Sequence, residues 1–351
     1  MKKETRLQLI LNYLEKNKEA NIARIVEFLN SFGKENITKI SVNRDLAELL
    51  EQQLIIRLGK GPAVRYQLSL GHDLLREINI ADYFRVEQTG RGAKKAFNFD
   101  VFDALAVVEL FNTEELEKLD ELDNKFKASI QSLPSEIKKK EYERLTIDFS
   151  WKSSAIEGNT YTLLETENLL KNHQEASGHT REEAQMILNH KEALNYLLQN
   201  KDKYKEVLVN KIEDVHYLLV QGLGVERNIR KRMVGISSTD YVPLGNEFQI
   251  REALEKMCRI VSEKKDVFSK SFLLNLLIAY IQPFGDGNKR TSRMMGNAVL
   301  IAHDSCPLSY RSISDSEYKK AVLLFYEQNN LRYFKELFME QFEFAVNTYF
   351  L

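Results

Sequence analysis

The segment Gln282-Pro-Phe-Gly-Asp-Gly-Asn-Lys-Arg-Thr-Ser-Arg293 lies between two apolar runs that both predict buried helices. Residues 272–281 are almost entirely apolar, and apolar residues return at helical spacing from Met294 onward. The segment is therefore expected to be a loop that ends at the N-terminus of the second helix. Free backbone N–H groups and the helix dipole make such an N-terminus a site for anions.

The side chains of this loop suit a polyphosphate and a metal ion. Gly285 and Gly287 let the backbone approach a ligand closely, because they carry no Cβ atom. Asp286 is the one carboxylate of the loop and offers the oxygen ligand that Mg²⁺ prefers. The residues that can bind phosphate oxygens are Gly287, Asn288, Lys289, Arg290 and Arg293. The loop therefore predicts a Mg²⁺–polyphosphate site, with a plain helix cap as the alternative.

A second segment, Ser153-Ser-Ala-Ile-Glu-Gly158, ends a helical pattern with a carboxylate. The negative end of the helix dipole disfavours Glu157 by about 0.3–1 kcal/mol if the side chain is exposed. We therefore expect a cation beside this carboxylate. A surface glutamate without a function is the alternative.

These segments resemble motifs of the Fic/Doc (Fido) family. Residues 282–293 are similar to its signature loop, His-Pro-Phe-x-Asp/Glu-Gly-Asn-Gly-Arg-x-x-Arg, and residues 153–158 to its inhibitory-helix motif, Ser/Thr-x-x-x-Glu-Gly/Asn. Between them, residues 232–236 and 241–243 resemble the family's flap, a β-hairpin that holds a target segment by strand addition. The resemblance covers residues 100–350 and implies a mainly α fold, a helical Fic core with one small hairpin.

The resemblance also implies a reaction, the transfer of AMP from ATP to a hydroxyl side chain of a target protein. Asp286 would hold Mg²⁺, and Asn288 and Arg290 would bind phosphates. Arg293 would hold the γ-phosphate, and Glu157 would pair with Arg293 and block this pose. The inhibitory helix is expected at about 148–158 and the flap at about 232–245, with Gly235, Ile236 and Tyr241 docking the target.

Two positions depart from the family pattern. Gln282 stands where the family has its catalytic His, and a carboxamide cannot act as a general base near neutral pH. Loss of a general base typically slows a reaction about 10²–10⁴-fold. Lys289 replaces a glycine of the adenylylating members, and Asn-Lys-Arg instead resembles the Doc branch, which transfers the γ-phosphate. His216 and His303 are expected to be structural and not to replace the missing base.

Residues 1–70 predict three helices followed by a β-hairpin. Helical patterns begin near Thr5 and Ala20, the second ending at Gly33, and Ser41 is expected to cap the third. Strand-like runs at 54–58 and 63–68 flank a turn. This order resembles a winged helix-turn-helix domain. The expected organisation is a winged-helix-like domain at 1–70, a connector at 71–98 and a Fic domain at 99–351.

The N-terminal module carries an excess of positive charge. Residues 1–70 hold 12 Lys and Arg against 8 Asp and Glu, whereas the rest of the chain holds 38 against 43. In a winged helix the third helix enters the major groove and the wing contacts phosphates. The residues placed to contact DNA are Ser41, Asn43, Arg44, Lys60 and Arg65. Because Asp45, Glu48 and Glu51 of the same helix repel phosphate, a protein-interaction or dimerisation module is the alternative.

Composition narrows the class of protein. The 351 residues carry a formal net charge of -1 and include only 5 Pro and 15 Gly, which favours two mainly helical domains. Cys258 and Cys306 form no pair motif, which argues against a disulfide scaffold or a cysteine zinc site. The N-terminus lacks the apolar run of a signal peptide, and no apolar stretch is long enough for a bilayer, so we expect a cytoplasmic location without a membrane partner. The pattern leaves a homodimer open.

Three functions follow from these observations. The first is an ATP-binding Fic enzyme that adds AMP to a target protein or removes it, autoinhibited by Glu157 and weakened by Gln282. In this hypothesis Glu157 is the one remaining candidate base. The second is a catalytically inactive Fic core that acts as a nucleotide-responsive, DNA-binding transcriptional regulator. The third is a Doc-like phosphotransferase, which Lys289 alone supports.

Overall fold

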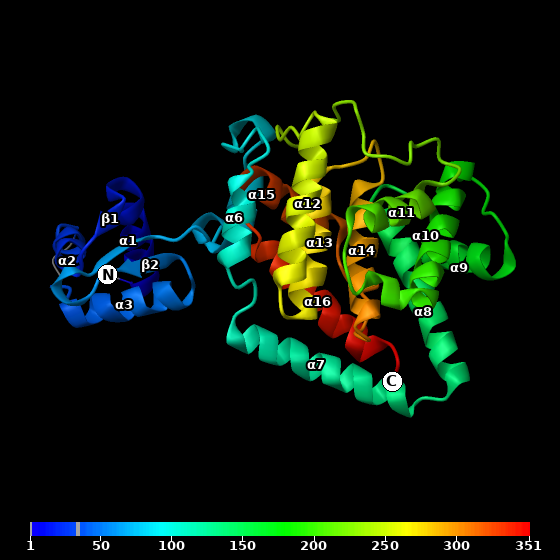
Figure 1. Cartoon of the computed structure of the whole chain (residues 1–351), viewed down its shortest axis with the longest axis horizontal. Helices are drawn as coiled ribbons and strands as arrows, with labels where there is room; N and C mark the ends of the chain where they lie inside the picture. Colours follow the sequence, from blue (N-terminus) through cyan, green and yellow to red (C-terminus); the bar gives the residue numbers. More distant parts are fainter. Residues whose placement is uncertain (1, 33–35) are drawn as a thin grey trace. The chain divides into compact units, whose positions relative to one another are not determined.

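The computed structural model describes residues 2–32 and 36–351, and the chain divides into two compact units (Figure 1). The first unit comprises Met1–Ile78 and Asp103–Asn112, and the second comprises Asn79–Phe102 and Thr113–Leu351. Within the described part of the chain, no helix combines the length and apolarity needed to cross a bilayer.

The first unit consists of helices and a small antiparallel sheet. Its strands have the order β1-β3-β2, with Tyr66 of β3 opposite Ala20 on one side and Arg57 on the other. The elements are α1 (Lys3–Asn17), β1 (Glu19–Ala20), α2 (Ile22–Asn30), α3 (Lys39–Glu51), β2 (Ile55–Leu58), η1 (Gly61–Ala63), β3 (Arg65–Leu68) and α4 (His72–Leu75). The three expected helices and the hairpin are therefore present.

Some boundaries in this unit differ from the expected ones. The short strand β1 was not predicted, because two residues are too few to show an alternating pattern. The N-terminal cap of α3 is Thr38, whose Oγ1 accepts the backbone N–H of Ser41, so the expected cap at Ser41 is wrong. Gly33, expected to end the second helix, lies outside the described residues, and α2 ends at Asn30.

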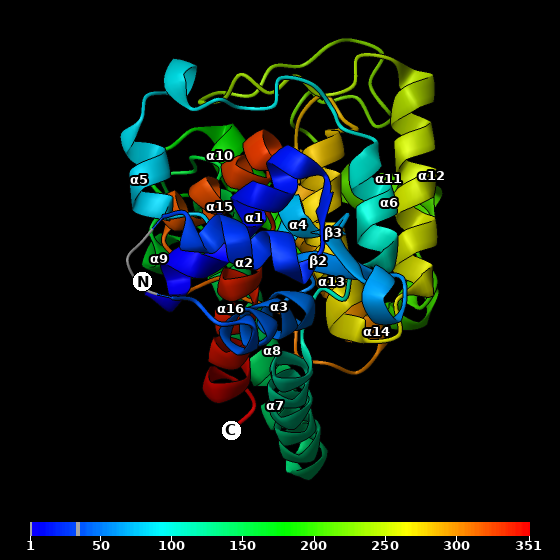
Figure 2. The same ribbon diagram turned by 90° about the vertical axis from the view of Figure 1, so that its left-hand side faces the viewer.

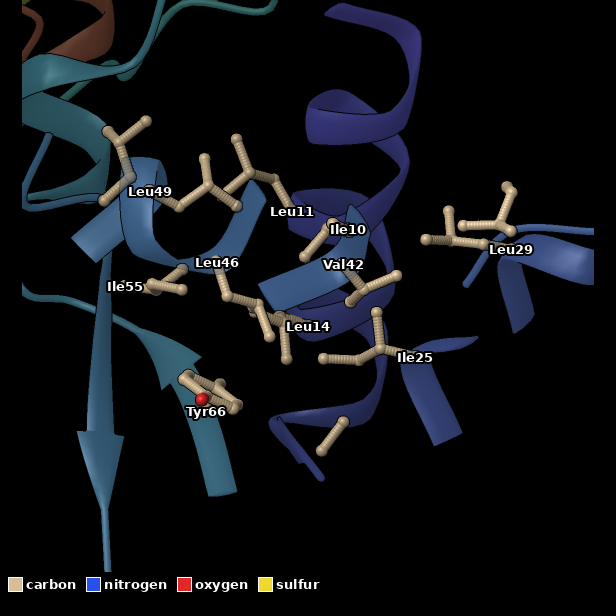
Figure 3. Close-up of a cluster of buried hydrophobic side chains, with 13 residues drawn as sticks. Ile10, Leu11, Leu14, Ile25, Leu29, Val42, Leu46, Leu49, Ile55 and Tyr66 are labelled. Carbon is tan, nitrogen blue, oxygen red and sulfur yellow. The ribbon is translucent and has the colours of Figure 1, made fainter. Parts of the chain in front are cut away.

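The core of the first unit is formed by one apolar face from each helix. Figure 3 shows Ile10 and Leu14 of α1 beside Val42 and Leu46 of α3, with Tyr66 contributed by the sheet. Residues four apart lie on the same face of a helix, so both pairs point into one interior. This packing fixes the position of α3, whose opposite face is exposed to solvent.

The second unit is helical, with α13 and α14 at its centre, α12 beside α13 and α11 beside α14 (Figure 1). Its helices are α5 (Ile80–Arg85), η2 (Gln88–Gly90), α7 (Thr113–Ser132), α8 (Ser135–Ala155), α9 (Leu163–Asn172), α10 (Arg181–Gln199), η3 (Lys201–Tyr204), α11 (Val209–Val220), α12 (Glu247–Glu263), α13 (Val267–Ile281), α14 (Asn288–Ala302), α15 (Asp315–Gln328) and α16 (Arg332–Thr348). Helix α6 (Asp100–Val107) is divided between the two units.

The central position of α13 follows from its sequence. It is mostly apolar and has no continuous polar face, and such a helix is stable only when other helices surround it. The loop after it leads directly into α14, which is buried along almost its whole length. At the edge of the unit, α7 packs on α16, and the two helices run toward the same end (Figure 2).

Residues 79–98, expected to belong to an exposed connector, instead pack on the second unit. The backbone N–H of Lys94 donates to the carbonyl of Glu327 at 2.8 Å, and the hydroxyl of Tyr83 donates to the Glu327 carboxylate at 2.8 Å. Arg91 also donates to the carbonyl of Ser238 at 2.8 Å. The glycine and lysine residues of this segment are typical of a linker, but its polar groups form hydrogen bonds with distant residues of the second unit.

The β-hairpin expected at about 232–245 is not formed. This segment has no strand, and in the described residues the only sheet lies in the first unit. Its one β-type contact is an isolated parallel bridge between Val242 and Ala96, where Val242 N–H donates to the Lys95 carbonyl at 3.0 Å. A regular ladder is interrupted because Pro243 has no N–H to donate and Ser238 adopts a φ of 69°.

Candidate functional site

The loop between α13 and α14 is held in one shape by its own side chains. Asn288, the first residue of α14, accepts the backbone N–H of Phe284 at 2.8 Å and donates to the Gln282 side-chain oxygen at 3.0 Å. Beneath the loop, the His216 ring stacks on Phe284 with centroids 3.7 Å apart, and its Nε2 lies 3.0 Å from the Asp286 carbonyl. The loop is therefore fixed from within and from below.

A glycine is required where this loop enters α14. Gly287 adopts a φ of 80°, and a Cβ atom at this position would lie 3.0 Å from Cγ1 of Val220. Gly287 is the N-terminal cap of α14, and because it has no side chain it makes no side-chain capping hydrogen bond to the helix. Gly285, by contrast, faces open space, because nothing lies within 4 Å of its would-be Cβ atom.

Three cations crowd the first turns of α14. Lys289, Arg290 and Arg293 lie at the positive end of the helix dipole, where positive side chains are disfavoured. The two guanidinium groups are buried, and Nη1 of each has no hydrogen-bond partner among the described atoms. Buried, partly unsatisfied cations at a helix N-terminus require an anion.

The carboxylate of Glu157 lies against two of these cations. Its Oε1 is 2.9 Å from Nη2 of Arg293, and its Oε2 is 3.1 Å from Nζ of Lys289. Lys289 and Arg293 are four residues apart, which places both on the same face of α14. The expected cation beside Glu157 is thus present twice. The unfavourable position of this carboxylate after α8 is offset by the positive end of α14.

The charges around Glu157 determine its ionisation. Burial alone raises the pKa of this carboxyl, but the nearby Arg293 and Lys289 outweigh burial and lower the pKa to about 2. Glu157 is therefore an anion at every pH near neutrality. A group this acidic is a poor general base, so this environment does not favour the role of water-activating base that the sequence left open.

Arg293 is held by further contacts besides the ion pair. Its Nε donates to Oγ of Ser153 at 2.9 Å, and its Nη2 donates to the Ser153 carbonyl at 2.7 Å. Ser153 Oγ in turn lies 3.0 Å from Nε2 of the buried His190, whose pKa is lowered to about 3 by burial. The Tyr318 ring lies 5.1 Å from the guanidinium carbon. Arg293 is therefore held from two positions, Ser153 in the last turn of α8 and Glu157 directly after that helix.

Gln282 is bound into the helix end. Its Nε2 donates to the Ala279 carbonyl at 2.6 Å and lies 3.3 Å from the Tyr326 hydroxyl. Its backbone carbonyl accepts the Nε of Arg230 at 2.7 Å. Burial raises the pKa of Tyr326 well above its ordinary value, so this neighbour stays protonated and offers no base. Nδ1 of His303, directly after α14, lies 2.9 Å from the Val299 carbonyl oxygen, to which it can donate.

Asp286 is the sole carboxylate of the loop and is suited to a metal that arrives with phosphate. It is 69% exposed, and its Oδ2 lies 2.8 Å from Nη2 of Arg290. The described residues contain no group of three or more His, Cys, Asp or Glu side chains that could hold a metal by themselves. One exposed carboxylate beside buried cations fits Mg²⁺ whose remaining ligands are phosphate oxygens and water.

Residues 232–245, which were expected to dock a target protein, are anchored to the second unit by buried side chains. Tyr241 is buried and stacks on Tyr280 at 4.9 Å, so its expected contact with a target protein is corrected to an anchoring role. Gly235 is exposed and Ile236 is half-buried. Arg230, which the sequence did not single out, donates to carbonyls of residues 232, 244 and 282 and so ties the segment to the loop.

The residues expected to contact DNA lie on the first unit. Asn43, Arg44, Lys60 and Arg65 are exposed, and Ser41 is half-buried. Arg65 also pairs with Glu19 at 3.2 Å across the sheet. Two further exposed cations, Lys39 of α3 and Arg57 of β2, were not singled out.

The acidic residues of α3 are largely neutralised within the unit. Asp45 is buried and receives two hydrogen bonds from Arg6, at 2.7 and 2.8 Å. Glu48 pairs with Lys3 at 2.6 Å. The argument that these side chains repel phosphate was therefore wrong for Asp45, whose carboxylate does not face solvent. The long spacing between Arg6 and Asp45 left no sign of this pair in the sequence.

Comparison with known proteins shows that the part of the chain around the loop is similar to a known protein family. The Fic/DOC family profile matches residues 206–300, which include the α13–α14 loop but not Glu157. "Protein adenylyltransferase Fic" of Nematostella vectensis is 28% identical over 218 residues, covering 59% of this chain and 49% of that protein. The chain thus spans about half the length of this curated relative.

Solved structures share the fold at low sequence identity. Fic-1 of C. elegans (aa134–508) superposes with a TM-score of 0.56 at 17% identity, over 71% of this chain and 79% of the other. A Fic-domain signaling protein from Bacteroides thetaiotaomicron gives 0.55 at 18%, over 66% and 94%. A Fic family protein from Desulfovibrio desulfuricans gives 0.55 at 18%, over 67% and 72%. The chain has the mainly helical Fic fold and carries a domain of the Fic/DOC family, related to protein adenylyltransferases.

Proposed function

We propose that the second unit is an ATP-binding Fic core whose phosphate site is closed by its own Glu157. The observation that carries this proposal is the pairing of Glu157 with both Lys289 and Arg293 at the N-terminus of α14. The Glu157 carboxylate of the chain itself pairs with the two cations that would otherwise bind a terminal phosphate. Binding of ATP in a productive pose then requires Glu157 to leave these cations.

The residues present fit ATP with Mg²⁺. The unsatisfied Nη1 atoms of Arg290 and Arg293 and the uncapped helix N-terminus supply donors for phosphate oxygens. Asp286 would hold Mg²⁺, which neutralises charge on the phosphates during transfer. Asn288 and Lys289 complete the phosphate-binding set, with Lys289 freed when Glu157 departs.

The chemistry that we propose is adenylyl transfer, weakened because the catalytic base is replaced. The relative from Nematostella vectensis is named a protein adenylyltransferase, which supports AMP as the transferred group and a protein as the target. Gln282 can orient a group through hydrogen bonds but cannot accept a proton from a hydroxyl. Removal of AMP from a target and γ-phosphate transfer are the alternatives within the same site.

A double variant, Gln282→His with Glu157→Gly, tests this function with α-labelled and γ-labelled ATP. The first change restores a base and the second removes the internal anion. Protein labelling from α-labelled ATP is expected, with Glu157→Gly alone at least 100-fold slower because a general base contributes about 10²–10⁴-fold. Labelling from γ-labelled ATP alone would instead establish phosphotransfer. No labelling from either, with ATP binding intact, would favour a regulatory protein.

A second candidate function, DNA binding by the first unit, is favoured by one observation. Asp45 and Glu48 are paired inside the unit with Arg6 and Lys3, so α3 is less acidic toward a ligand than its sequence indicates. We propose that the unit is a winged-helix DNA-binding module. Its reading helix is α3, with Asn43 and Arg44 exposed.

A binding assay on the full chain tests this second candidate. Affinity for duplex DNA is expected to fall with rising salt, because phosphate contacts release counterions. Replacing Arg44 and Lys60 by alanine is expected to weaken binding, and the loss of the Lys60 phosphate contact should reduce the salt slope by about 1. Lys16→Ala, at an exposed position of α1, is the matched control. Salt-independent or absent binding would leave a protein-interaction module.

A further inference from the structure

A cavity of about 710 Å³ lies within the second unit, on residues separate from the phosphate site. Its lining residues come from α7, α8, α9, α10, η3, the C-terminal end of α14 and the residues directly after that helix. Its volume falls in the range of about 300–1,000 Å³ that is typical of small-molecule pockets. Its apolar lining is formed by Phe126, Ile130, Ile147, Leu170, Leu198 and Ile301.

The charged groups at this cavity leave an excess of positive charge. Lys201 and Asp304 form an ion pair with each other. Lys191 donates to the backbone carbonyl of Leu170 at 2.6 Å and forms no ion pair with a carboxylate of the described residues. In the part of the chain that the structure describes, Lys139 forms no ion pair either. The three lysines exceed the carboxylates by one charge, since Glu143 is the second acid in the lining.

We propose that this cavity binds a small amphipathic carboxylate, with its apolar chain on the lining and its anionic head at Lys139 and Lys191. The Tyr142 hydroxyl offers an additional donor at the same wall, because burial raises its pKa to about 12 and keeps it protonated. A ligand with no charge leaves the lysine excess unmatched, and a ligand without an apolar chain leaves the lining unfilled.

The cavity adjoins the helix that closes the phosphate site. Residues 139–147 of α8 line the cavity, and Ser153 of the same helix holds Arg293. From Ile147 to Ser153 the helix rises about 9 Å, at 1.5 Å per residue. A ligand in the cavity adds contacts to α8 in the closed arrangement. We therefore infer that the bound carboxylate strengthens closure by Glu157 and weakens ATP binding, a regulatory step that rests on the proposed function.

Decanoate is the probe for the binding site. Its affinity for the full chain is measured by calorimetric titration. Leu198→Trp fills the cavity from a half-buried position and is expected to weaken decanoate binding at least tenfold. Leu164→Trp, at a 67% exposed position of α9, is the matched control and is expected to bind decanoate as the wild type does. Equal binding by both tryptophan variants, or no decanoate binding by the wild type, would overturn the proposal.

A second pair of variants tests the charge without filling the cavity. Lys139→Met combined with Lys191→Met is expected to reduce decanoate affinity about tenfold, since charge-assisted hydrogen bonds are lost. The affinity for decanol is expected to stay the same. Lys171→Met, outside the lining, is the control. An unchanged ratio of decanoate to decanol affinity in the double variant would overturn the assignment of an anionic ligand.

The regulatory step has its own measurement. Saturating decanoate is expected to weaken Mg·ATP binding several-fold in the wild type and to have no effect in Leu198→Trp or Glu157→Gln. Unchanged or tighter ATP binding would refute the coupling. If no variant binds ATP while decanoate still binds, the proposed function fails and the carboxylate site stands.

Discussion

Replacing Glu157 by glutamine removes one negative charge from the proposed phosphate site and changes the shape of the side chain very little. The amide keeps the shape of the carboxylate and can still form hydrogen bonds. It no longer compensates Lys289 and Arg293, which lie 3.1 and 2.9 Å from the carboxylate oxygens. We expect the variant to bind Mg·ATP more tightly than the wild type does.

The pKa of Glu157 sets the size of this effect. The shift from the ordinary value of 4.5 to about 2 is the net preference of the site for the charged form, after the cost of burial. At about 1.4 kcal/mol for each pKa unit, this preference amounts to about 3 kcal/mol. In the wild type, a phosphate binds only by displacing the carboxylate, and the protein then loses this stabilisation of charged Glu157. The variant is therefore expected to gain up to roughly 100-fold in affinity.

Calorimetric titration of Mg·ATP into both proteins measures this gain. Glu182→Gln, an exposed change in the first turn of α10, controls for the loss of one negative charge from the chain. Thermal unfolding of each variant verifies that the fold is retained. If Glu157→Gln binds ATP no more tightly than Glu182→Gln, the carboxylate does not close the site, and the closure mechanism is refuted.

Four further changes have definite expected outcomes. Lys289→Met removes the second cation, so the difference in ATP affinity between Glu157 and its glutamine variant should shrink several-fold in calorimetry. Because the pKa of Glu157 is lowered, its contribution to stability is complete above about pH 4.5 and is lost as the pH falls toward 2. ATP affinity of the wild type relative to Glu157→Gln should accordingly stay constant from pH 5 to 8. Arg6→Ala leaves Asp45 buried without its partner and should lower the free energy of unfolding of the first unit by about 3 kcal/mol in denaturant titration. Gly287→Ala forces a φ of 80° on a residue with a Cβ atom and should lower the melting temperature, at a cost of about 1–3 kcal/mol.

The sequence allowed the centre of the site to be anticipated because its groups are close along the chain. An apolar helix, a glycine-containing loop and a helix with basic residues at its start can be read within residues 272–300. The link to Glu157 needed the family resemblance, since 136 positions separate it from Arg293 and no local pattern connects them. Contacts of this kind depend on packing between helices, which periodicity does not reveal.

Other parts of the site could not be read from spacing. His216 lies among apolar residues and has no neighbouring motif, yet it supports the loop through Asp286 and Phe284. Tyr241 resembles a docking residue in sequence but is buried against Tyr280. In both cases tertiary burial decides the role of the side chain, and a single sequence does not show burial at isolated positions.

The turn that carries Glu157 is secured on both sides. Trp151 donates to the Tyr161 carbonyl at 3.1 Å, and Asn159 donates to the Glu183 carbonyl at 2.8 Å. In the proposed closure this carboxylate competes with ATP as part of the same chain, so its local concentration is fixed however dilute the protein is. Whether ATP can bind depends on the fraction of molecules in which α8 has moved Glu157 away from Lys289 and Arg293, and not on the protein concentration. The apparent affinity for ATP would equal the intrinsic affinity multiplied by that fraction. Any change that shifts the position of α8 would therefore change the apparent affinity by degrees.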